Sequence, residues 1–114
     1  MTTSNDLEQA IVSVVGADKL AQPVFAPDED VAPPYVRLMP GDAERVSATD
    51  RTWIWQIPYD VILCTTYRDR ALERKMIWAL DGAGVGFDLS FGYDERERVF
   101  LAVFTTDPVE ESEE

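Results

Sequence analysis

A run of alternating apolar and polar side chains over residues 53–66 restricts the fold more than any other feature of this chain. One side of the run is large and mostly apolar, with Trp53, Trp55, Ile57, Tyr59, Val61 and Leu63. A period of two is typical of a β-strand that buries one of its faces. We therefore expect one long strand here, with Pro58 at a sheet edge or a bulge because proline donates no backbone hydrogen bond.

Apolar spacing elsewhere predicts two helices. Residues 5–16 place their apolar side chains on one helical face, and Gly16 follows as a stop. Residues 69–81 carry a second apolar stripe, and the glycine-rich segment 82–86 ends it. These glycines follow a helix and precede a strand, which is the reverse of the order in a phosphate-binding loop.

Three further segments, residues 35–39, 87–91 and 99–105, have strand character. The last is apolar on both faces, which favours an interior position in a sheet. The proline-rich segment 17–34 indicates a loop, with Val24 and Phe25 as a candidate short strand inside it. We expect an α+β fold, with a mixed or mostly antiparallel sheet of about four to five strands and two helices packed on one face.

The length of 114 residues and the apolar content of 46% predict one folded domain. The net charge is −12, from 22 acidic and 10 basic residues. Five carboxylates lie in the last eight residues, on Asp107, Glu110, Glu111, Glu113 and Glu114. We expect a single domain over residues 1–106, followed by a flexible acidic tail over residues 107–114.

The inventory of reactive side chains argues against an enzyme. The chain has no histidine, so it lacks the commonest general base and metal ligand, and its one cysteine, Cys64, has no partner for an internal disulfide. No phosphate-binding, dinucleotide-binding or serine-hydrolase motif is present. We therefore expect no catalytic residue, no metal and no cofactor, and a buried thiol at Cys64.

The charge and hydropathy also limit the partners. An acidic body repels phosphate groups, so conventional nucleic-acid binding is not expected. The polar start of the chain predicts no signal peptide, and its apolar stretches are too short for a membrane span. The acidity serves solubility alone on the simplest interpretation. Trp53, Trp55 and Tyr59 are core residues on the simplest interpretation, or are completed by another subunit, where aromatic residues are favoured.

Several segments together form a pattern of residue types. The pattern begins with Pro-Pro-Tyr and a short apolar strand, here Pro33 to Leu38. A loop follows, with Ala48, Asp50, Arg51 and Trp53, and then a strand over residues 60–65 and a helix with Glu73, Met76 and Leu80. In this pattern, from about Pro33 to Phe104, the chain resembles the tail completion, or tail terminator, proteins of long-tailed siphophages.

The resemblance implies an α/β subunit of a hexameric ring at the head-proximal end of the tail tube. Such a ring stops tube polymerisation and meets the head connector or stopper, and DNA passes through its lumen without specific binding. The partners would be other copies of this chain, the major tail tube protein and the connector. The location would be the virion tail, with assembly in the host cytoplasm. On this hypothesis the loop at residues 42–52 reaches a neighbour through Asp42, Glu44, Arg45, Asp50, Arg51 and Trp53.

A different class of function is open from the charge alone. A small acidic protein can act as an inhibitor or DNA mimic that docks on a basic host enzyme. Such a protein forms a one-to-one complex that weakens as salt rises, because the attraction is electrostatic.

Overall fold

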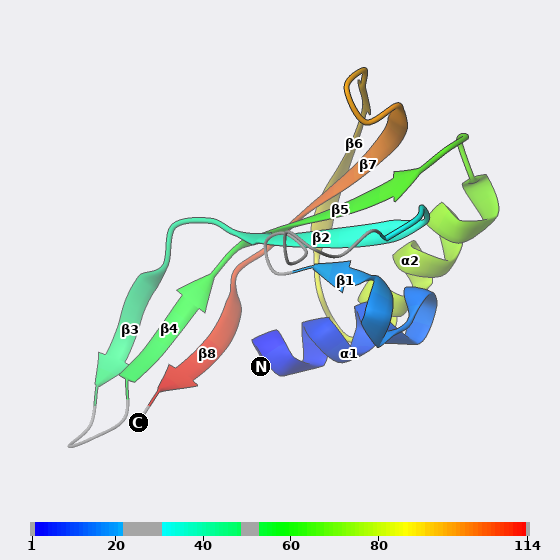
Figure 1. Ribbon diagram of the computed structural model, residues 1–114. Coiled ribbons are helices and arrows are strands. Elements are labelled where there is room, and N and C mark those ends of the chain that lie inside the picture. The colour runs from blue at the N-terminus through cyan, green and yellow to red at the C-terminus, as the bar shows by residue number, and fades with distance from the viewer. Residues whose placement is uncertain (1, 22–30, 49–52, 114) are drawn as a thin grey trace.

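The computed structural model describes residues 2–21, 31–48 and 53–113 as two β-sheets and two helices (Figure 1). The larger sheet has the strand order β1-β2-β5-β7-β6. Its strands are β1 (Leu20–Ala21), β2 (Tyr35–Pro40), β5 (Tyr59–Thr65), β6 (Phe87–Asp94) and β7 (Val99–Thr106). Only β1 and β2 are parallel within it. The predicted α+β fold with a mixed sheet is confirmed.

The helices α1 (Ser4–Val15) and α2 (Arg70–Gly82) lie within one or two residues of their predicted bounds. Thr3 caps α1 in a reciprocal capping box with Asp6. Asp69 caps α2, since its carboxylate accepts a hydrogen bond of 3.0 Å from the backbone N–H of Leu72. A short 3₁₀ turn, η1 (Ala17–Lys19), connects α1 to β1. Both helix starts therefore follow from local sequence.

The hydrophobic core lies between the helices and one face of the larger sheet. Leu7 and Ile11 from α1 and Met76 and Leu80 from α2 are fully buried there. The sheet contributes two rows of cross-strand neighbours that share this face: Val36, Leu63 and Ala102, and Leu38, Val61 and Phe104. Strand β7 lies between β5 and β6, so its predicted interior position is confirmed.

The long strand expected over residues 53–66 is two strands in two sheets. Strand β4 (Trp53–Ile57) belongs to a second sheet with the order β3-β4-β8, whereas β5 belongs to the larger sheet. The break falls at Pro58, which has no N–H for a ladder, and its carbonyl accepts a 2.8 Å hydrogen bond from the backbone N–H of Gly41. The expectation of one continuous strand is therefore wrong, although Pro58 does interrupt it.

The carboxyl-terminal segment is also part of the fold. Residues expected to form a flexible tail make strand β8 (Val109–Glu113), which pairs antiparallel with β4. Val109 is only 2% exposed and packs in the core, and this apolar anchor in an acidic segment explains why the segment is ordered. The proposed boundary at residue 106 is therefore wrong.

Two other expectations concern loops. The polar segment expected to be a loop contains β3 (Glu44–Ala48), the edge strand that completes the small sheet. The proline-rich segment begins with η1 and β1, and the candidate strand at Val24 and Phe25 lies outside the described residues. The small sheet extends away from the helix-covered body, as Figure 1 shows.

Candidate functional site

One face of the small sheet brings residues of the predicted interface together with a residue of the predicted acidic tail. Arg45 of β3, Trp55 of β4 and Glu111 of β8 are direct cross-strand neighbours, so their side chains share a face. Trp53 lies on the same face of β4, two residues from Trp55. We call these four side chains, Arg45, Trp53, Trp55 and Glu111, the tryptophan face.

The aromatic rings of this face are stacked and capped by a cation. The ring centroids of Trp53 and Trp55 are 6.4 Å apart, with an angle of 18° between the ring planes. The Arg45 guanidinium carbon lies 5.2 Å from the centroid of Trp53, within the range of a cation–π contact. A shallow cavity of about 200 Å³ lies beside Trp55, between Ala43, Ile57 and Glu111.

Exposure increases along the tryptophan face with distance from the body. Ile57 and Val109, at its base, are buried, while Trp53 is 42% exposed. The interpretation of Trp53 as a core residue is therefore wrong, because the break at Pro58 carries β4 away from the helices. An exposed tryptophan stacked on a half-buried one, as Trp53 is on Trp55, is typical of a protein interaction surface.

Glu111 sits between the small sheet and the start of α1. The Ser4 hydroxyl donates a 3.4 Å hydrogen bond to Glu111 Oε1. Burial raises the pKa of Tyr59, and the negative charges of Glu111 and Glu8 raise it further. The carboxylates here thus help to keep the phenol protonated.

The remaining residues of the predicted interface and of the predicted acidic tail lie outside the tryptophan face or outside the described residues. Asp42 and Glu44 are both exposed: Asp42 lies just before β3, and Glu44 is its first residue. Glu110 is opposite Gln56 and lies on the reverse face from Glu111, and Glu113 pairs with Trp53 at the end of β8. Asp50, Arg51 and Glu114 lie outside the described residues.

A second exposed aromatic cluster was not predicted from sequence. Phe91 and Tyr93 of β6 are 53% and 49% exposed, and Phe100 of β7 is 39% exposed. The rings of Tyr93 and Phe100 meet edge to face with centroids 4.9 Å apart. We call Phe91, Tyr93 and Phe100 the hairpin aromatics. The alternation in residues 87–91 signalled a strand, but it could not show that the hairpin extends past the helices, as it does in Figure 1.

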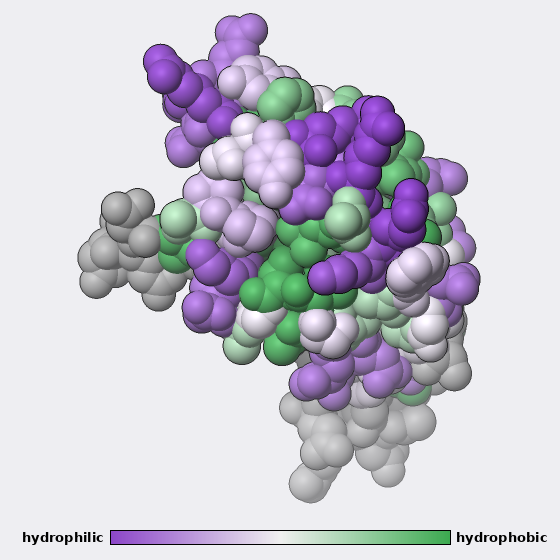
Figure 2. All heavy atoms as spheres, turned by 90° about the vertical axis from the view of Figure 1, so that its right-hand side faces the viewer, coloured by the Kyte–Doolittle hydropathy of each residue, from purple (hydrophilic) through white to green (hydrophobic). Residues whose placement is uncertain are grey.

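A cavity of about 340 Å³ lies between α2 and β6, next to the hairpin aromatics. Its lining combines three cations, one carboxylate and three apolar side chains: Arg68, Arg70, Arg74, Glu73, Ile77, Leu89 and Phe91. The Arg68 guanidinium carbon lies 4.2 Å from the ring centroid of Phe91, and Arg68 Nε lies 3.6 Å from Glu73 Oε2. We call this the arginine cavity. Figure 2, which looks onto the side of α2, shows strongly hydrophilic side chains around a hydrophobic patch.

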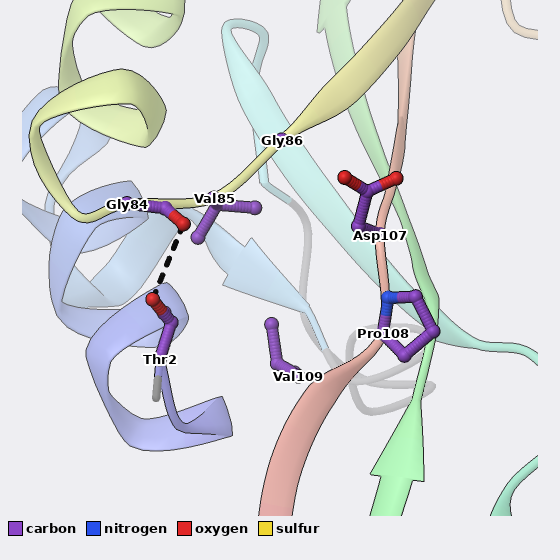
Figure 3. A pocket seen from close by; sticks show the side chains of 7 residues that line it. All are labelled: Thr2, Gly84, Val85, Gly86, Asp107, Pro108 and Val109. Atoms are coloured by element: carbon purple, nitrogen blue, oxygen red, sulfur yellow. Dashed lines mark hydrogen bonds between the residues drawn. The ribbon is translucent and has the colours of Figure 1, made fainter.

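A third cavity, of about 300 Å³, lies where the glycine-rich segment meets the end of β7 (Figure 3). The Thr2 hydroxyl donates hydrogen bonds to the carbonyls of Ala83, at 3.0 Å, and Gly84, at 3.3 Å. Asp107 supplies the one carboxylate of the lining. General acid–base catalysis by paired carboxylates needs two such groups, so this cavity holds no such pair.

The described residues contain neither a cluster of metal ligands nor a helix that could span a membrane. No three His, Cys, Asp or Glu side chains in the described part of the chain are grouped so that they could hold a metal ion. No helix among residues 2–21, 31–48 and 53–113 is both long and apolar enough to cross a bilayer.

Comparison with protein-family models, with curated proteins and with solved structures finds no match to this chain.

Proposed function

We propose that this chain is a tail terminator, or tail completion, subunit of a long-tailed phage. In this role, copies of the chain close into a hexameric ring at the head-proximal end of the tail tube. The ring stops polymerisation of the major tail tube protein and joins the tail to the head connector. The proposal combines the sequence resemblance with the exposed aromatic surfaces described above.

The observation that carries the proposal is the presence of two different exposed aromatic surfaces at opposite ends of one small domain. The tryptophan face lies on the small sheet, and the hairpin aromatics lie at the far end of the larger sheet (Figure 1). A ring of identical subunits requires a heterologous contact, in which two unlike patches of each copy meet. A molecule 48 Å long with unlike patches at its two ends satisfies this requirement.

The residues of the tryptophan face suggest how such a contact holds. Stacked tryptophans bury a large apolar area at a low cost in side-chain entropy, and they are enriched at interface hot spots. Arg45 and Glu111 flank them with opposite charges, which favours one register of the partner over others. The net charge of −12 fits a lumen through which DNA passes without binding.

Electron microscopy of phage particles assembled without this protein tests the proposal. We expect tails of uncontrolled length, because nothing stops polymerisation of the tube. DNA-filled heads without tails, and no overlong tubes, would instead assign the chain to the connector. Normal particles would exclude both roles.

A DNA mimic is the competing function, and stoichiometry separates the two. A mimic binds a basic DNA-binding protein one to one and is released as salt rises. A ring subunit binds its own copies and the tube protein instead.

A further inference from the structure

Strand β6 is the least protected sheet edge in the described part of the chain. It pairs with β7 over eight consecutive residue pairs without a register shift, and it contains neither proline nor lysine. The other edges are shorter or irregular: β1 has two residues, β3 has a register shift between Arg45 and Ser47, and β8 has five residues. A long, regular sheet edge without proline, lysine or a bulge can accept a further strand from another chain. Soluble proteins usually prevent such pairing by protecting their sheet edges.

The arginine cavity gives this edge a preference for acidic strands. Its lining includes Leu89 and Phe91 of β6 together with Arg70 and Arg74 of α2. Among the described residues neither Arg70 nor Arg74 has a carboxylate within 4.0 Å, so both guanidinium groups can receive one. Arginine binds carboxylates through two parallel hydrogen bonds when the geometry allows. An extended segment that carries glutamates therefore fits this place.

The most acidic extended segment of the chain is its own carboxyl-terminal strand. The stretch from Glu110 to Glu114 contains four glutamates and one serine. Thr3 forms a β-bridge with Glu110 of β8. On the side of β8 that faces away from β4, no described residue forms a β-bridge with residues 111–113. Strand β6 starts beside the start of β8, where the Asp107 N–H donates a 2.8 Å hydrogen bond to the Gly86 carbonyl. The two strands then diverge, and β8 runs into the small sheet, so residues 111–113 reach the arginine cavity only from a second copy (Figure 1).

We infer that the acidic end of β8, residues 111–113, in one copy adds as a strand along β6 of the next, with the Glu111 carboxylate on the arginine cavity. Backbone hydrogen bonds supply affinity in such strand addition, and the side chains that meet pockets supply specificity. The contact is heterologous and joins unlike ends, as a ring requires. This inference rests on the proposed function, because it names surfaces through which the copies meet.

Chemical cross-linking tests the contact directly. Ser90 of β6 and Ser112 of β8 are both exposed, whereas Cys64 is only 1% exposed and therefore protected from reagents. We expect a short bismaleimide to join S90C of one copy to S112C of another when the two variants are mixed. S90C mixed with S13C, an exposed position on α1, is the control and should give no such product. Equal yields in both mixtures would overturn the inference.

Charge reversal tests the role of the arginines with a closely matched pair. Arg74 lines the cavity, whereas the neighbouring Lys75 is exposed and does not line it. We expect Arg74→Glu to weaken self-association by about tenfold or more, and Lys75→Glu to change it much less. Mixing Arg74→Glu with a Glu111→Arg, Glu113→Arg variant should restore a mixed complex.

The outcomes separate this inference from the proposed function. If the protein self-associates but gives no S90C–S112C product, the β6–β8 contact is wrong. Equal effects of Arg74→Glu and Lys75→Glu on self-association would also contradict the contact. Neither result contradicts the proposed function as a ring subunit. A chain that binds neither its own copies nor the tube protein overturns both.

Discussion

Trp55 of β4 and Glu111 of β8 are direct cross-strand partners in the small sheet. This pairing joins a residue of the long alternating run to a residue of the segment expected to be a free tail. Glu111 also accepts a hydrogen bond from Ser4 at the start of α1. The carboxyl-terminal strand thus links the small sheet to the helical layer. We expect its loss to destabilise the whole domain.

Val109→Ala should destabilise the protein although it lies in the segment that composition alone marks as a tail. The side chain is 2% exposed, so its truncation removes buried apolar area and leaves space in the core. We expect a loss of about 1–2.5 kcal/mol in the free energy of unfolding. Urea unfolding followed by tryptophan fluorescence measures it, because β4 carries two tryptophans.

Ser112→Ala is the control for that experiment, because Ser112 is exposed on the same strand. We expect a change within about 0.5 kcal/mol. Equal unfolding midpoints for Val109→Ala and the unchanged protein would contradict the burial of β8.

Gly84→Ala and Gly82→Ala should change stability in opposite directions. Gly84 has a φ of +78°, where an L side chain is strained, and a Cβ there would lie 3.1 Å from Thr2 Oγ1. We expect Gly84→Ala to cost about 1 kcal/mol. Gly82 ends α2, and an added Cβ meets nothing within 4 Å, so Gly82→Ala should stabilise by about 0.5 kcal/mol. Thermal unfolding compares the two, and a stabilising Gly84→Ala would contradict the turn geometry.

The Cys64 thiol should stay protonated to a higher pH than a free cysteine. Burial raises its pKa, and this outweighs the hydrogen bond from Tyr35 and the charge of Arg37, which lower it. Above about pH 8.5, the ordinary pKa of cysteine, the unfolded chain loses this proton while the native chain keeps it. The native state then binds more protons, so the free energy of unfolding should fall as pH rises past that value.

Ultraviolet absorbance of the thiolate, titrated in the native protein, measures this pKa. Cys64→Ala provides the baseline and should remove the part of the pH dependence that begins at about pH 8.5. Native Cys64 that ionises at the ordinary pKa of cysteine would show that the site is hydrated and not buried as described.

Trp53→Ala should weaken self-association and leave folding nearly intact. Its side chain is 42% exposed on the tryptophan face and does not belong to the hydrophobic core, so truncation removes exposed interface area and no core contact. Interface tryptophans commonly contribute about 2 kcal/mol or more to binding, which corresponds to a loss of roughly thirtyfold in affinity. Sedimentation velocity measures the association.

Trp78→Ala is the matched control, because Trp78 is 66% exposed on α2, outside the tryptophan face, and does not line the arginine cavity. We expect the Trp78→Ala variant to self-associate with nearly the same affinity as the unchanged protein. If both substitutions weaken association equally, the tryptophan face has no special role.

Local signals in the sequence account for much of this fold. The apolar stripes of α1 and α2 predicted both helices, and the apolar segment that forms β7 predicted an interior strand. These features depend on residues near one another in the chain, where periodicity and capping act directly.

The remaining features depend on contacts between distant residues. Periodicity through residues 53–66 is the same whether or not the chain changes sheets at Pro58, so it could not reveal two strands. The order of β8 depends on one buried valine and on pairing with β4, more than fifty residues earlier. Likewise, the tryptophan face needs β3, β4 and β8 together, and only Arg45, Trp53 and Glu111 of its four members were predicted site residues.

The mass of the purified protein in solution, measured alone and with the major tail tube protein by native mass spectrometry, tests the central claim most directly. A closed ring of identical copies, alone or seated on the tube protein, is the result that the proposed function requires. A strict monomer in both samples would contradict it.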